Sequence, residues 1–109
     1  MRIAPLLALV SLSGLAAGAA LGAVSHATVS QKGRMFSIDR IEIRRGESVT
    51  FLNDDTVPHN IVSRSPGNEF DLGSQPTGAA TDVTFAVAGE ARVICAIHPR
   101  MKLTVKVAD

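Results

Sequence analysis

The chain has 109 residues, with 11 Lys or Arg side chains against 10 Asp or Glu side chains, one Cys, and neither Trp nor Tyr. This length allows one small domain, and a balanced charge without a basic run argues against nucleic-acid binding. A single cysteine excludes a disulfide within the chain, so its thiol needs another explanation.

The first 27 residues are typical of a secretory signal peptide. Arg2 supplies a positive start, and residues 3–24 are uncharged and mostly Leu, Ala, Val and Gly. In Ser25-His26-Ala27, small residues then occupy the −3 and −1 positions of a cleavage site. We expect cleavage after Ala27, which leaves a domain of residues 28–109 in the periplasm or outside the cell. The alternative is an uncleaved anchor, which would be the protein's only membrane contact.

The remaining sequence predicts short strands and no helix. Runs of alternating or β-branched residues, separated by turn residues, predict strands at 28–31, 36–38, 41–43, 48–53, 59–62, 81–87, 91–96 and 103–107. Val83, Phe85 and Val87 are expected to face the core. The nearly continuous apolar run at 91–96 indicates a central strand. Seven or eight strands with this spacing predict an all-β fold, an antiparallel sandwich or barrel.

The acidic residues of the domain do not suggest catalysis. Asp54-Asp55 breaks the strand at 48–53 and is interpreted as a solvent-exposed turn. Glu69 and Asp71 flank Phe70 in the least regular segment, 63–79, and have no evident partner. We therefore expect no catalytic carboxylate pair.

Three potential metal ligands lie close together in the sequence at the end of the central strand. Cys95 lies at the end of that strand, and His98 and Met101 follow at steps of three on the expected loop. Alternation along a strand would put positions 95 and 98 on opposite faces, whereas a tight loop can bring all three to one point. Thiolate and thioether sulfur are soft ligands that together select copper, and zinc seldom binds Met.

A copper site of this kind needs a second imidazole. Residues 28–109 contain two histidines, His98 and His59, and the latter lies 36 positions before Cys95. Two His and one Cys in a trigonal arrangement, with a weak axial Met, form an electron-transfer copper site. The sequence therefore predicts one copper ion bound by His59, Cys95, His98 and Met101.

At these residues the sequence resembles the cupredoxins, or small blue copper proteins. The resemblance covers essentially all of 28–109 and centres on Val57-Pro58-His59-Asn60 and the Cys-x2-His-x2-Met segment, whose short gaps are most similar to those of amicyanin. It implies a Greek-key β-sandwich, one type 1 copper ion, and single-electron shuttling between redox proteins by Cu(I)/Cu(II) cycling. It also implies that the Asn60 N–H points at the Cys95 sulfur and that the Asn60 side chain ties the two ligand segments together.

Two other functions use the same residues. A periplasmic copper carrier would share the ligands but release the metal to an acceptor. An enzyme would use Cys95 as a nucleophile with His98 or His59 as the base. No third orienting group is evident for that chemistry, and Met101 would have no role, so we expect the protein not to be an enzyme.

Redox partners are expected to dock near His98, on a monomeric protein. Arg100 and Lys102 flank this histidine, Arg64 follows the strand at 59–62, and residues 91–108 contain no acidic side chain. These charges predict a positive rim that would steer an acidic partner. Pro58, Pro99 and Met35 are candidates for an apolar contact surface. Alternatively, the basic side chains are only solvated strand and turn positions.

Overall fold

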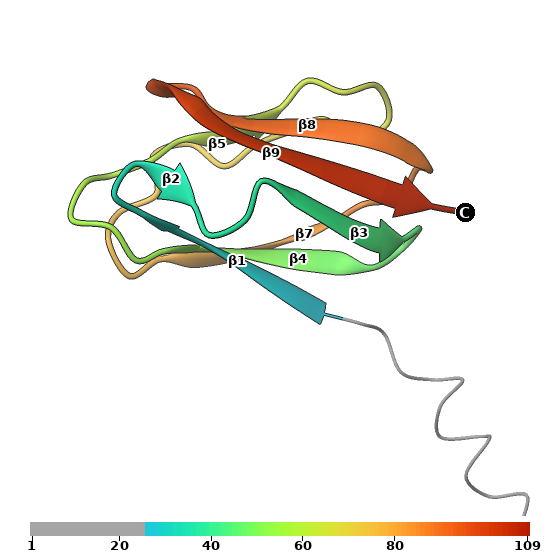
Figure 1. Ribbon diagram of the computed structural model, residues 1–109, viewed down its shortest axis with the longest axis horizontal. Coiled ribbons are helices and arrows are strands. Elements are labelled where there is room, and N and C mark those ends of the chain that lie inside the picture. Colours follow the sequence, from blue (N-terminus) through green and yellow to red (C-terminus); the bar gives the residue numbers. More distant parts are fainter. Residues whose placement is uncertain (1–25) are drawn as a thin grey trace, which may run out of the picture.

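The computed structural model describes residues 26–109, which form two facing β-sheets (Figure 1). One sheet has the order β2-β1-β4-β7, with β2 (Met35–Phe36), β1 (His26–Lys32), β4 (Ser48–Asn53) and β7 (Ala80–Thr84). The other has the order β3-β9-β8-β5-β6, with β3 (Arg40–Arg44), β9 (His98–Ala108), β8 (Gly89–Cys95), β5 (Ile61–Ser63) and β6 (Phe70–Asp71). The expected all-β sandwich is confirmed. Over the described range there is no helix that could cross a membrane.

The sheets are mixed rather than purely antiparallel. β1 runs parallel to β4, and β3 runs parallel to β9. The reason is that β3 lies in the opposite sheet, so the chain leaves the β1 sheet and re-enters it at β4 in the same direction. β8 lies between β9 and β5, which confirms its predicted central position.

The predicted signal peptide, residues 1–27, lies outside the described residues except for its last two positions. His26 and Ala27 open β1 and pair with Ser48 and Val49 of β4. The domain boundary between residues 27 and 28 remains a prediction.

The core consists of the inward-facing residues of both sheets. In β4 alternation buries Val49, Phe51 and Asn53, and Phe85 packs into the same core. Val87 is instead 42% exposed, because β7 ends at Thr84 and the chain has left the sheet. The prediction of an inward Val87 was therefore wrong.

The irregular segment 63–79 is pinned to the core by two side chains. Phe70 and Leu72 pack against the buried cluster, and Phe70 stacks edge-on against Phe85 with ring centroids 5.9 Å apart. This packing returns the chain to the end of the sandwich where Gln75 meets His59.

Candidate metal centre

A β-bulge in the β8–β9 hairpin places two of the predicted ligands together. Ile94 pairs with Lys102, but the next residue, Cys95, pairs with His98, so β9 contains extra residues at this point. Such a bulge bends the strand and redirects its side chains. The expectation that His98 and Met101 lie on a loop was wrong, because both lie on β9. The bulge, rather than a loop, brings His98 toward Cys95.

His59 reaches the same place from a different part of the chain. It forms an isolated β-bridge with Gln75, in which each backbone N–H donates to the other residue's carbonyl, with N···O distances of 3.1 and 2.7 Å. One residue later, the Asn60 carbonyl accepts the Ala96 N–H at 2.8 Å. The His59 segment is thus fastened directly to the turn of the β8–β9 hairpin.

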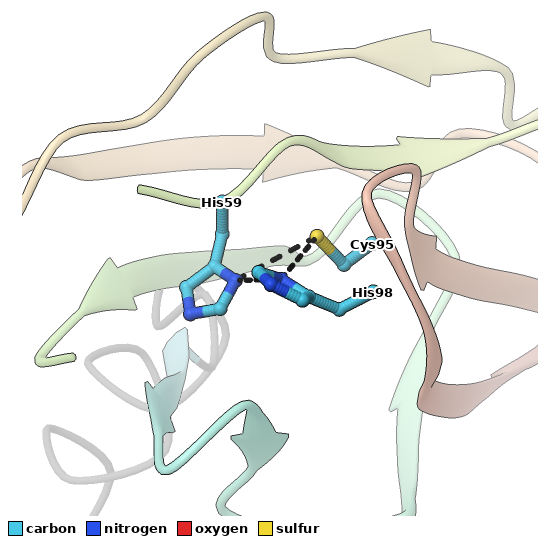
Figure 2. Close-up of side chains that lie close together, drawn as sticks. All are labelled: His59, Cys95 and His98. Carbon is cyan, nitrogen blue, oxygen red and sulfur yellow. Dashed lines mark hydrogen bonds between the residues drawn. The ribbon is translucent and has the colours of Figure 1, made fainter. Parts of the chain in front are cut away.

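The three donor atoms form a compact triangle (Figure 2). His59 Nδ1 lies 3.1 Å from His98 Nδ1, and the Cys95 Sγ lies 3.6 Å from the first nitrogen and 3.7 Å from the second. Within residues 26–109 this is the one group of His, Cys, Asp and Glu side chains close enough together to hold a metal ion.

The dimensions of this triangle fit one metal ion. The centre of the circle through its three corners lies about 2.0 Å from each atom, near the usual 2.0–2.3 Å metal bonds to nitrogen and sulfur. Two imidazoles and one thiolate around a single point match the trigonal part of an electron-transfer copper site.

Burial differs among the four predicted ligands. His59 and Cys95 have no exposed surface, and Met101 is 1% exposed, whereas His98 is only partly buried. Met101 belongs to the same buried cluster as Cys95. Its burial is compatible with an axial thioether, and its role as a ligand remains a prediction.

Of the two contacts predicted for Asn60, the structure contains one. Its backbone N–H donates to the Cys95 Sγ at 3.4 Å, as the family resemblance implied. Its side chain does not tie the ligand segments, because Asn60 Nδ2 donates instead to Asp71 Oδ1 at 2.7 Å. The two segments are linked instead by the Asn60 backbone, through its N–H to Cys95 Sγ and its carbonyl to the Ala96 N–H. Asp71 therefore has a partner that the sequence did not reveal.

Hydrogen bonds to Asp71 change its acidity. The amide of Asn60 and then the backbone N–H of Gly73 lower the pKa of this carboxyl from its ordinary value. Both bonds favour the charged carboxylate, so the group stays ionised to lower pH than a free aspartate.

Asp55 is the functional neighbour that sequence reasoning missed. The prediction that Asp55 lies in a solvent-exposed turn was wrong, because this residue is buried, with only 6% of its surface exposed. Its Oδ2 accepts a hydrogen bond from His59 Nε2 at 2.9 Å. The backbone N–H of Arg34 and then the His59 side chain hold the pKa of Asp55 well below its ordinary value. Nothing in the Asp54-Asp55 pair distinguishes the buried residue from the exposed one.

Comparison with known proteins agrees with the β-sandwich fold and with copper as the cofactor. The family described as copper binding proteins, plastocyanin/azurin family, matches residues 23–108. None of the curated proteins matches the chain in sequence.

Solved structures are similar over most of the domain. A purple cupredoxin from Nitrosopumilus maritimus is 29% identical with a TM-score of 0.67, over 75% of this chain and 99% of that one. Amicyanin from Paracoccus versutus is 25% identical with a TM-score of 0.68, over 82% and 87% of the respective chains. A copper-containing nitrite reductase from Thermus scotoductus is 28% identical with a TM-score of 0.71, over 78% of this chain. The chain spans only 23% of that enzyme's length.

The fold and the family match together define a cupredoxin, a type 1 copper protein. The chain belongs to the plastocyanin/azurin family of copper-binding proteins, and its cofactor is copper.

Proposed function

We propose that this protein shuttles single electrons between redox partners, with His59, Cys95, His98 and Met101 as the ligands of one copper ion. The observation that carries the proposal is the triangle of His59 Nδ1, His98 Nδ1 and Cys95 Sγ, which fits a single ion. A bound copper ion supplies reversible one-electron chemistry between Cu(I) and Cu(II).

The protein's own contribution is to hold the ligands still. The β-bridge at His59 and the Asn60–Ala96 hydrogen bond fix one imidazole relative to the hairpin that carries the other ligands. The Asn60 N–H on the Cys95 sulfur withdraws electron density from the thiolate, which tunes the potential. A rigid ligand set changes little between oxidation states, and this favours fast electron transfer.

Partner docking is proposed at the groove beside His98. This groove has a volume of about 400 Å³ and is lined by Gly33, Arg34, Met35, Ile97, His98, Pro99 and Arg100. Met35 and Ile97 are more than half exposed and line the same groove, and grouped exposed apolar side chains are typical of interaction sites. His98 belongs to both the triangle and the groove, so it offers the shortest route from the metal to a docked partner.

The groove beside His98 carries one positive side chain that the sequence predicted and one that it did not. Arg34, which sequence analysis did not single out, lies there with Arg100. Arg64 instead lines a separate groove with Arg92. The two guanidinium groups around an apolar floor suit a partner whose contact face carries acidic side chains.

The predicted signal segment supports export of this protein to the periplasm or the cell exterior. Mass determination of the protein recovered from a secreting host would test this. An N-terminus at Thr28 is expected, and an intact Met1 in the membrane fraction would indicate the anchor instead.

The direct test of the proposed function is the visible spectrum after addition of one equivalent of Cu(II). An intense blue band that ascorbate bleaches and an oxidant restores is expected. A pale spectrum, or one that does not cycle, would contradict the proposal.

A copper carrier is the second candidate, because it would use the same four ligands. Burial of His59, Cys95 and Met101 favours retention of the ion over its release. Incubation of the copper-loaded protein with a chelator separates the two functions. Loss of copper over hours supports electron transfer, and loss within seconds supports copper delivery. A Cys95 nucleophile is disfavoured, because its side chain has no exposed surface for a substrate to reach.

A further inference from the structure

One oxygen of Asp55 joins a predicted copper ligand to the edge of the docking groove. Asp55 Oδ2 accepts hydrogen bonds from His59 Nε2 at 2.9 Å and from the backbone N–H of Arg34 at 2.8 Å. The His59 side chain is fully buried and the Asp55 side chain is 7% exposed. Water therefore competes little for this contact, and a charged hydrogen bond is strong in such surroundings.

The position of the Asp55 carboxylate is itself tightly determined. Its Oδ1 accepts the Thr56 N–H at 2.8 Å, and its own N–H donates to Asn53 Oδ1 at 2.9 Å. The Asp55 carbonyl accepts the Thr77 hydroxyl at 2.7 Å. Because bonds from several segments hold this residue, its side chain is a fixed reference point for the imidazole.

The contact selects one form of the His59 ring. A carboxylate can only accept, so Nε2 must carry the proton and the lone pair of Nδ1 is left free. This Nδ1 is the atom that faces Cys95 Sγ and His98 Nδ1. A carboxylate behind a ligating imidazole also makes the imidazole more basic, which favours the more highly charged metal ion.

The same oxygen holds the turn between β1 and β2. Gly33 and Arg34 both have left-handed backbone conformations, with φ of 60° and 57°. This conformation is uncommon for Arg, because its Cβ atom makes positive φ unfavourable. The bond from its N–H to Asp55 stabilises this turn. The turn carries Arg34 and Met35 into the groove that His98 also lines.

We propose that Asp55 is a positioning residue for electron transfer, which sets the orientation and tautomer of His59, lowers the copper potential, and ties this ligand to the docking edge at Arg34. This inference rests on the proposed function. It adds a residue that acts on the copper through His59 and does not ligate it.

The first test compares Asp55→Asn with Asp54→Asn in the copper-loaded protein. Both variants lose one negative charge at adjacent positions. Asp54, however, is exposed, and it is its backbone N–H, not its side chain, that donates a hydrogen bond, to the Gln31 carbonyl. We expect Asp55→Asn to weaken Cu(II) binding about tenfold or more, and Cu(I) binding less. Each tenfold difference between the two affinities raises the potential by about 59 mV. Equal potentials in the two variants would overturn the proposal.

A measurement on the parent protein covers the case in which Asp55→Asn fails to fold. In ¹⁵N-labelled, Cu(I)-loaded protein, the His59 Nε2 proton should be visible, hydrogen-bonded and slow to exchange. Exchange as fast as that of a free imidazole would overturn the proposal. A parent protein without a blue Cu(II) form would instead refute the proposed function, so the two failures are distinguishable.

Discussion

The two segments that supply the predicted ligands are organised in different ways. The β8–β9 hairpin provides Cys95, His98 and Met101 within seven residues, and its geometry comes from one bulge. The segment around His59 provides a single ligand, which is held by Gln75, Asp55 and the hairpin. The first is determined locally, whereas the second depends on contacts between residues far apart in the sequence.

This difference predicts a division of roles. Changes in the hairpin should alter the kind of site that forms, because they remove donor atoms. Changes around the His59 segment should alter the potential and stability of a site of the same kind, because they remove support for a ligand that is still present.

The largest expected effect is that of Cys95→Ser. This change removes the only thiolate, so the blue charge-transfer band should disappear on addition of Cu(II). The circular dichroism of the β-sandwich should remain, since Ser is close to Cys in size. An unchanged visible spectrum would remove Cys95 from the site.

Met101→Gln should keep copper bound but change its potential. A harder oxygen in place of the thioether favours Cu(II), so the midpoint potential should fall in a spectroscopic titration. This shift is opposite in sign to that expected for Asp55→Asn. A rise in potential would contradict an axial role for Met101.

Arg100→Glu should affect encounter with a partner and leave the metal site intact. In stopped-flow reduction by an acidic redox protein, we expect a second-order rate lower by up to about tenfold at low salt, with a flatter salt dependence. Lys106→Glu is the matched control, since it makes the same charge change on β9 at a position that does not line the groove. Identical rates for the two variants at every ionic strength would show that Arg100 does not steer docking.

The smallest expected effect concerns Asp71, which braces Asn60. Because the pKa of Asp71 is lowered on folding, its contribution to stability is present above its ordinary value of 3.8 and is lost as the pH falls through the lowered value. Metal-free Asp71→Asn should therefore melt slightly below the parent at pH 7, and the difference should vanish in acid. A difference that persists at pH 2 would assign the effect to packing rather than to charge.

Several features of this protein were predictable from the sequence. Period-two alternation predicted the strand at 48–53 and the burial of one alternate set of its side chains, since side chains of a strand must alternate between faces, but it left open which set faces the core. The donor chemistry of Cys95, His98 and Met101, with His59 as the second imidazole, predicted copper before any geometry was known. These inferences depend on residue type and local spacing, which a sequence states directly.

Other features were decided only by the tertiary structure. The parallel pairing of β1 with β4 depends on how strands from distant parts of the chain meet. The bulge that turns His98 toward Cys95 lies within one hairpin, but it is a shift in pairing register that residue types do not state. Asp54 and Asp55 are identical in type and adjacent, yet one is exposed and the other is buried behind His59. Their roles differ because the fold brings Arg34 and His59 to one carboxylate only, and no local pattern encodes which one.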